Sequence, residues 1–215
     1  MGGAFMKLRS ASLLFIAIIL GAWTVTASNL ANDSSEVAGH QTDKPSFAAI
    51  AQQLIALGEE DQRDRKKAMT PGFNDARLAE ADRRREAAWL EITSGRLLGL
   101  SEVGEGAVSA QFLMLQHSGD RALQADMARQ MQELVEKGDF PKDAFATFID
   151  RQLVYDGKPQ RFGTQANESF ELYPIEDESS VDKRRESMGL PPIAQLRAKL
   201  QQVKNAVASG KGLGE

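Results

Sequence analysis

Two polar residues, Gln116 and His117, close a predicted helix that is apolar on nearly every side. This helix spans roughly residues 103–118, and at about 100° per residue both side chains project between apolar neighbours into the protein. A buried polar group without a partner costs about 1–3 kcal/mol, so we expect each to have one. Histidine titrates near neutral pH, which makes His117 the candidate general acid or base. The alternative is a helix-end histidine that binds terminal carbonyl groups.

A second group of polar residues continues the apolar face of the first predicted helix. Ser46 is a suitable N-cap for this helix, and apolar residues follow it at helical spacing. They are Phe47, Ile50, Ala51, Leu54 and Ile55. The same face then extends to Asp61, Gln62 and Arg65. These three are either solvated beyond the end of the core or directed inward as part of a site, and the pattern favours neither strongly.

A third group lies on the helix predicted from residue 74 or 75 to about 92. Asp82 and Arg85 stand between Leu78 and Trp89 on one helical stripe, so the inward face carries charge in its middle. The two residues are one turn apart and can pair with each other. A buried structural ion pair is therefore the alternative to a functional role.

Further helices are predicted in the second half of the chain. One begins at the Asp120 cap, a second at Pro141, a short basic one after Ser180, and a fourth after the prolines at 191–192. Asp150 and Arg151 flank the apolar stripe of the helix that begins at Pro141, on opposite sides. Arg185, on the helix after Ser180, either binds an anion or pairs in solvent with the acidic residues 176–178.

The stretch DGKPQRFGTQ, residues 156–165, interrupts these helices. An Asp-Gly pair between two short apolar segments is typical of a two-residue hairpin turn, so we expect a small antiparallel β-hairpin near 153–175. Gln160 and Gln165 offer donors and acceptors, and Gly163 permits close backbone approach. A well-bonded structural hairpin is the alternative to a hairpin that forms part of a site.

These patterns predict a mainly α protein with one helical domain of five to seven helices over residues 46–205. A flexible leader over 28–45 precedes it and a disordered tail over 206–215 follows it. The first 27 residues have the features of a signal peptide, with Lys7 and Arg9 before an apolar segment and small residues before a cut after Ala27. We therefore expect a periplasmic or secreted protein, with an uncleaved N-terminal membrane anchor as the alternative.

Composition narrows the possible partners. Removal of residues 1–27 takes away two basic residues and no acidic one, which leaves 24 basic and 30 acidic residues and a net charge of −6. Without a basic stripe, nucleic acid is not an expected partner. The chain has no cysteine, so thiolate chemistry and Cys-ligated zinc are excluded. One histidine among carboxylates is a poor metal site, and we predict no metal and no cofactor.

Five short motifs recur in a set order: DQRDR at 61–65, LQH at 115–117, DR at 150–151, GKPQRFGTQ at 157–165 and VDKRR…GLPP at 181–192. In this order they resemble an uncharacterised, mostly bacterial family of domains of unknown function. The resemblance spans about residues 47–192 and implies a domain and a site, not a reaction. The positions that it implies for the site are Asp61, Gln62, Arg65, Gln116, His117, Asp150, Arg151, Gln160, Gly163, Thr164, Gln165 and Arg185.

Three functions remain open from the sequence. The first is a hydrolase or lyase in the cell envelope, with His117 as acid or base, Asp61 or Asp150 orienting it, and Arg65 or Arg151 holding an anionic group. The second is a non-catalytic envelope module that binds a small polar ligand, peptide, glycan or protein partner. The third is a structural network of polar residues that fixes the helix arrangement.

Overall fold

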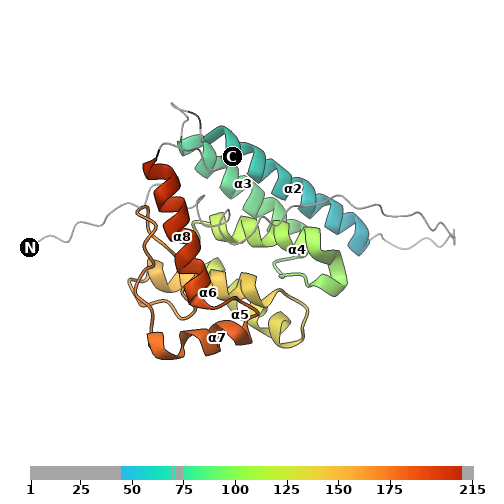
Figure 1. Cartoon of the computed structure of the whole chain (residues 1–215). Helices are drawn as coiled ribbons and strands as arrows, with labels where there is room; N and C mark the ends of the chain where they lie inside the picture. The colour runs from blue at the N-terminus through green and yellow to red at the C-terminus, as the bar shows by residue number, and fades with distance from the viewer. Residues whose placement is uncertain (1–44, 69, 71–74, 210–215) are drawn as a thin grey trace, which may run out of the picture.

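The computed structural model describes residues 45–68, 70 and 75–209, and within them the fold is helical (Figure 1). The seven α-helices of this part are α2 (Phe47–Ala68), α3 (Asp75–Thr93), α4 (Leu100–His117), α5 (Arg121–Glu136), α6 (Lys142–Tyr155), α7 (Val181–Ser187) and α8 (Ile193–Ala208), with a short 3₁₀ helix, η2 (Glu178–Ser180), before α7. The mainly helical class and the expected number of helices are confirmed. The α8 helix continues to Ala208, past the predicted end of the domain at residue 205.

The predicted signal peptide and residues 28–44 of the predicted leader lie outside the described residues. Among the residues that are described, no helix has both the length and the apolar character needed to cross a membrane.

Local capping sets the helix ends where the sequence indicates. The Ser46 hydroxyl accepts a hydrogen bond from the backbone N–H of Ala49 at 3.2 Å and so caps α2. The carboxylate of Asp120 accepts from the N–H groups of Ala122 and Leu123 at the start of α5. The α4 helix begins at Leu100, before the predicted start near residue 103, and its backbone is non-helical at Gly104.

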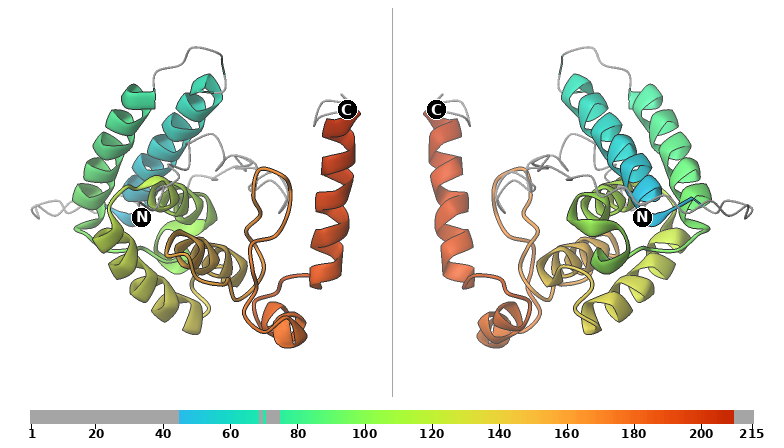
Figure 2. Two further views of the ribbon diagram at one scale, coloured as in Figure 1. Left: turned by 90° about the vertical axis from the view of Figure 1, so that its left-hand side faces the viewer. Right: turned by 90° about the vertical axis from the view of Figure 1, so that its right-hand side faces the viewer.

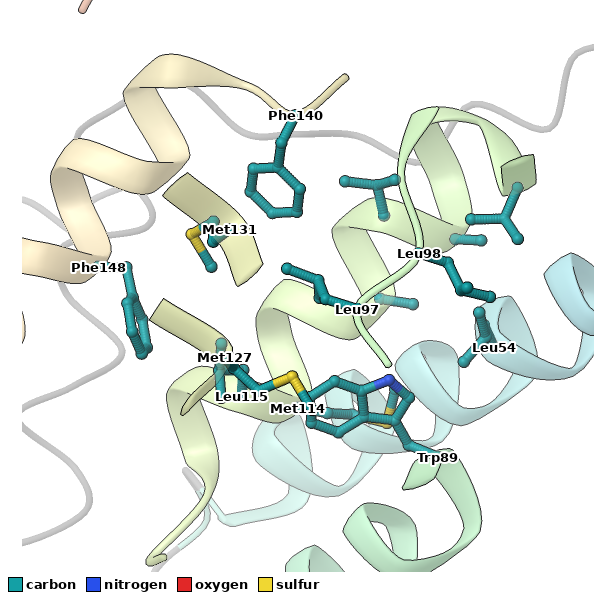
Figure 3. Close-up of a cluster of buried hydrophobic side chains, with 14 of the residues drawn as sticks. Leu54, Trp89, Leu97, Leu98, Met114, Leu115, Met127, Met131, Phe140 and Phe148 are labelled. Atoms are coloured by element: carbon teal, nitrogen blue, oxygen red, sulfur yellow. The ribbon is translucent and has the colours of Figure 1, made fainter. Parts of the chain in front are cut away.

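The main core lies where α4 meets α2, α3 and α5 (Figure 3). Trp89 from α3 and Leu54 from α2 are fully buried there, together with Met127 and Met131 from α5. Gln111 on α4 is also fully buried, and its amide bonds the N–H and C=O of Leu98, each at 3.0 Å. The Gln111 amide thus has hydrogen-bond partners for both its oxygen and its nitrogen, and it links the segment between α3 and α4 to the central helix.

A second, smaller apolar cluster holds the C-terminal part together. Val181 of α7 and Ile193, Leu196 and Leu200 of α8 are buried in it, against partly buried apolar residues of the segment 166–175. Figure 2 shows α8 standing at one side of the molecule, with the segment between α6 and α7 lying between it and helices α2 to α6. This segment is therefore packed on both of its sides.

The predicted β-hairpin near 153–175 is wrong. The α6 helix runs to Tyr155, and Asp156-Gly157 ends it: Gly157 has φ +70°, and the N–H groups of Gly157 and Lys158 donate to the carbonyls of Val154 and Leu153. This is the Schellman arrangement of a helix C-terminus. Beyond it the described residues form only isolated bridges, Gln160 with Ile175 and Ala166 with Leu172, and no sheet.

Candidate functional site

The polar second half of α2 faces the protein interior. Asp61 and Arg65 are buried, with relative exposures of 1% and 8%, whereas Gln62 between them is exposed. The Gln62 amide nevertheless reaches back and donates to Oδ2 of Asp61 at 2.9 Å. The structure thus decides between the two readings of this stripe: the helix has not left the protein, and two of its three polar residues point inward.

The inward-facing carboxylate of Asp61 meets the histidine at the end of α4. His117 Nδ1 lies 3.0 Å from Oδ1 of Asp61, although the two residues are 56 positions apart in the sequence. A carboxylate can only accept, so Nδ1 carries the proton and Nε2 presents its lone pair. Within the described residues Nε2 makes no hydrogen bond, and the His117 side chain keeps 12% of its surface exposed. The partner of His117 is therefore a side chain, not the terminal carbonyls of α4.

Burial and neighbouring charges set the protonation of this pair. Burial lowers the pKa of His117; the bond to Asp61 opposes this, and the positive charges of Arg65 and Arg151 add to it. Burial acts to raise the pKa of Asp61, but the bond to His117 and the charges of Arg65 and Arg85 outweigh it, so that this pKa is lowered. The pair is consequently a carboxylate and a neutral imidazole.

An ion-pair network between α2 and α3 supports Asp61. Arg65 and Arg85 donate to the same oxygen of Asp82, at 2.6 and 2.7 Å, and Arg85 also donates to Asp64 at 2.8 Å. Arg65 Nε lies 3.4 Å from Asp61 Oδ1, and Arg85 Nη2 lies 3.6 Å from it. The predicted Asp82–Arg85 pair is confirmed, as one contact of a larger network. Arg85 is 1% exposed and is the main member that sequence reasoning did not include in the site.

Asp150 and Arg151, which are adjacent on α6, point to different parts of the molecule. Arg151 Nη1 donates to Oε1 of Gln116 at 2.8 Å, so the predicted inward orientation of Gln116 has a partner. Tyr155, one turn further along α6, places its ring centroid 5.8 Å from the guanidinium carbon of Arg151. Sequence reasoning did not include Tyr155 in the site, although its spacing of four from Arg151 indicates the contact.

Asp150 organises the loop that follows α6. Its Oδ1 accepts from the backbone N–H groups of Arg161 and Phe162 at 2.7 and 3.0 Å, and its Oδ2 accepts from the N–H and the hydroxyl of Thr164, both at 2.9 Å. Burial raises the pKa of the Asp150 carboxyl, and these N–H donors oppose the rise. All of these bonds go to the loop, none to His117.

The other predicted residues of the GKPQRFGTQ motif complete the same loop. The Gln160 amide donates to the carbonyls of Gln165 and Tyr173, and its oxygen accepts from the N–H of Gln165. Gly163 has φ +67°, and a Cβ there would lie 2.7 Å from Cδ1 of Ile193 in α8, so a side chain at this position would strain the backbone and displace Ile193. Gln165 donates to the carbonyl of Thr147 on α6 at 3.2 Å.

Arg185 fixes the far side of this loop. It is fully buried, contrary to the expected solvated pairing with residues 176–178, and it donates to the carbonyls of Phe162 and Pro191, each at 2.6 Å.

The structure thus brings Asp61, Gln62, Arg65, Gln116, His117 and Arg151 into one group, which we call the His117 cluster. It gathers Asp150, Gln160, Gly163, Thr164, Gln165 and Arg185 into a second group, the loop cluster, and α6 carries one residue of the DR pair to each.

The carboxylates near His117 are paired with arginine side chains, which bears on whether they could bind a metal ion. Asp61, Asp64 and Asp82 each have an arginine within 4.0 Å. In the part of the chain that is described, no group of three or more His, Asp or Glu side chains is placed to hold a metal ion. The chemistry of these residues themselves is that of a neutral imidazole oriented by a carboxylate, beside arginine side chains.

The lowered pKa of His117 gives a measurable pH dependence. We expect its imidazole to titrate below the ordinary value of about 6.5, so that its NMR signals stay in the neutral form as the pH is lowered through 6.5. Because the unfolded chain takes up a proton at this histidine near pH 6.5 and the folded chain does not, its contribution to stability is complete above about 6.5 and is lost as the pH falls toward the folded pKa. The variant His40→Gln assigns the signals, since the chain has two histidines. A His117 pKa above 6.5 would show that the Asp61 bond outweighs burial.

Comparison with known proteins gives one match. A family model described as "Family of unknown function (DUF6624)" matches residues 48–206, which include both clusters. No curated protein and no solved structure matches the chain significantly. The match confirms the resemblance to a family of domains of unknown function that the motifs indicate. Because it covers most of the chain, the protein belongs to this family of unknown function, DUF6624.

Proposed function

We propose that this protein is an exported enzyme, a hydrolase or lyase of the cell envelope, in which His117 is the general acid or base and Asp61 orients it. The single observation that carries the proposal is the 3.0 Å contact between His117 Nδ1 and Asp61 Oδ1, which leaves Nε2 without a partner among the described residues. The export itself rests on the signal-peptide pattern of residues 1–27, with cleavage after Ala27, and an N-terminal anchor is the alternative.

The proposed mechanism uses the neutral state of the imidazole. Since burial and the nearby arginines lower the pKa of His117, its Nε2 holds a free lone pair at neutral pH and can accept a proton from a hydroxyl, a water or a carbon acid. The ionised Asp61 then stabilises the imidazolium that forms, and it keeps the ring in the productive tautomer throughout. The Gln62 amide and Arg65 hold the carboxylate in place.

Turnover by wild type and variants tests the proposal. The purified protein is incubated with a panel of carboxylic, phosphate and sulfate esters and of lyase substrates, and separately with envelope extracts followed by NMR. We expect at least one compound to be converted, and His117→Gln to reduce its rate by roughly 10²–10⁴-fold, which is the usual contribution of a general acid or base. Asp61→Asn should reduce the rate as well, because an amide can select the wrong tautomer. The matched control is His40→Gln, which should keep the full rate; equal turnover by His117→Gln would exclude the proposal.

A non-catalytic binding module for a peptide, glycan or protein partner of the envelope is the second candidate. One observation favours it: no Ser, Thr or Tyr hydroxyl is hydrogen-bonded to His117 within the described residues, so a nucleophile activated by this histidine has no support. Strand addition to a hairpin edge, however, has lost its basis, because the segment 153–175 forms no sheet. A compound that binds at the His117 cluster and is recovered unchanged under all conditions would favour this function over catalysis.

A further inference from the structure

Arg151 is a buried guanidinium that lacks most of its hydrogen bonds. Its relative exposure is 5%, and Nη1 donates to Gln116 at 2.8 Å. Its Nε and Nη2 are buried and have no hydrogen-bond partner in the described part of the chain, and the same holds for the amide nitrogen of the next residue, Gln152. Buried donors are nearly always bonded, so three unpartnered nitrogens on adjacent residues are an exception that needs an explanation.

The other buried arginines show what Arg151 is missing. Arg65 and Arg85 each bond carboxylates of the α2–α3 network. Arg185 bonds the carbonyls of Phe162 and Pro191 through Nη1 and Nε, and among the described residues only its Nη2 is buried without a partner. Among the described residues Arg151 has no carboxylate within 4.0 Å, and its neighbours include the neutral side chains of Gln116 and Tyr155. Burial lowers the pKa of Arg151; Tyr155 opposes this, and the positive charge of Arg65 adds to it.

The free edge of Arg151 has a definite orientation. Gln116 occupies Nη1, which leaves Nε and Nη2 side by side, the pair of N–H groups that binds both oxygens of a planar oxyanion. Gln116 therefore acts as a positioning residue. The positive charge of Arg151 contributes to the lowered pKa of His117, so the guanidinium lies near enough to the imidazole to act on it.

Partly exposed residues border Arg151 on its solvent side. Tyr155 is 38% exposed as a residue, and its ring centroid lies 5.8 Å from the Arg151 guanidinium carbon and 5.6 Å from that of Arg121. Arg121 also donates to the side-chain oxygen of Gln152. The Tyr155 ring thus has two guanidinium groups near it, that of the buried Arg151 and that of the exposed Arg121.

We infer that Arg151 binds the anionic group of the substrate, a carboxylate or a phosphate- or sulfate-type oxyanion, through Nε and Nη2 beside His117. The inference rests on the proposed function and specifies its substrate class. An arginine held for this purpose is left desolvated in the free protein and becomes saturated only when the ligand arrives. Such a residue lowers the stability of the free protein, as functional sites often do.

Anion titrations of the whole purified protein test this inference. Sodium phosphate, sulfate and acetate are added at constant ionic strength, and the melting temperature and the arginine Nε–H NMR signals are followed. We expect at least one anion to raise the melting temperature in a saturable way and to shift the Arg151 Nε–H signal. Arg151→Met should weaken this response by roughly tenfold or more, the usual effect of truncating one partner of a buried charge pair. The matched control is Arg129→Met, which removes an exposed arginine and should respond as wild type.

Further measurements separate a ligand-binding role from a structural one. Without added anion, Arg151→Met should melt at the same temperature as wild type or higher, because it removes an unpaired buried cation. Should this variant fail to fold, Arg151→Lys replaces it: lysine keeps the charge but lacks the two-pronged edge, so its anion response should be weakened. The inference is overturned by a wild type that responds to none of the three anions, by an Arg151→Met response equal to that of wild type, or by a clear loss of melting temperature in the anion-free Arg151→Met protein.

The two proposals fail in different ways. His117→Gln should keep the anion response of wild type while it loses turnover. Anion binding without any His117-dependent turnover would remove the catalytic role and leave the Arg151 site standing. Turnover that depends on His117 but not on Arg151 would remove the Arg151 site and leave the catalytic role of His117 standing.

Discussion

Asp150→Ala is expected to destabilise the fold by about 3–5 kcal/mol, since it leaves several buried donors without their acceptor. Three backbone N–H groups and the Thr164 hydroxyl converge on this carboxylate, which has 0% relative exposure. The donors of Phe162 and Thr164 would lose their partner in a buried place, and that of Arg161 in a partly buried one. Urea unfolding followed by circular dichroism measures the loss directly.

Asp150→Asn distinguishes the hydrogen-bonding role from a simple packing role. The amide has only one oxygen, so its NH₂ group would face N–H or O–H donors where the carboxylate has its second oxygen. We expect Asp150→Asn to lose a large part of the stability that Asp150→Ala loses. The control Asp126→Ala removes an exposed carboxylate that bonds Arg129 and Gln130 on its own helix, and its urea midpoint should hardly move. A stable Asp150→Ala protein would mean that the loop at 160–165 does not depend on this residue.

Arg85→Met is the second substitution with a large expected effect, a loss of about 3–5 kcal/mol. Arg85 is 1% exposed and lies within 4.0 Å of Asp61, Asp64 and Asp82. Its removal leaves these carboxylates with less positive charge in a largely buried place, and methionine cannot compensate. Breaking a buried ion-pair network by removing one partner costs far more than an exposed pair contributes. Urea unfolding again provides the measurement.

The neighbouring arginine offers a matched control. Arg84 is 67% exposed on its side chain and pairs with Glu60 at the surface, so Arg84→Met should change stability by about 0.5 kcal/mol or less. If excess negative charge is the cause of the loss, then adding Asp82→Asn to Arg85→Met should restore part of the stability, which a double-mutant cycle quantifies. Additive effects would indicate that the two residues do not interact.

The two clusters have different roles: the loop cluster fixes the shape of a segment of the fold, and the His117 cluster carries the groups proposed to act on a ligand. In the loop cluster, Asp150, Gln160 and Arg185 bond mainly backbone groups, and such bonds fix the shape of a segment that has no regular secondary structure. Among the described residues, His117 Nε2 and two nitrogens of Arg151 have no partner in the His117 cluster, against one nitrogen of Arg185 in the loop cluster, and unsatisfied groups mark places where a ligand gains binding energy. The motifs carry both kinds of residue in one stretch of sequence.

Local signals account for what the sequence determined. Helix positions follow from apolar residues at spacings of three and four and from caps such as Ser46 and Asp120, because both depend on neighbours within about one turn. The inward direction of Gln116 and His117 follows in the same way from the apolar residues around them. The same approach failed at Asp156-Gly157, since a glycine with positive φ suits the turn of a hairpin and the end of a helix equally.

Tertiary structure alone decided which polar residues meet. Asp61 and His117 are 56 positions apart, and Gln116 and Arg151 are 35 apart, so no local periodicity links them. Their contacts arise because α2 and α4 pack together and α6 brings its DR pair between two groups of residues. The sequence did not decide whether Asp61 and Arg65 are solvated or buried, since a polar stripe has the same pattern whether solvent or another helix covers it. The position of α3 and α4 against α2 settles this question, and with it the protonation of His117 on which the proposed chemistry rests.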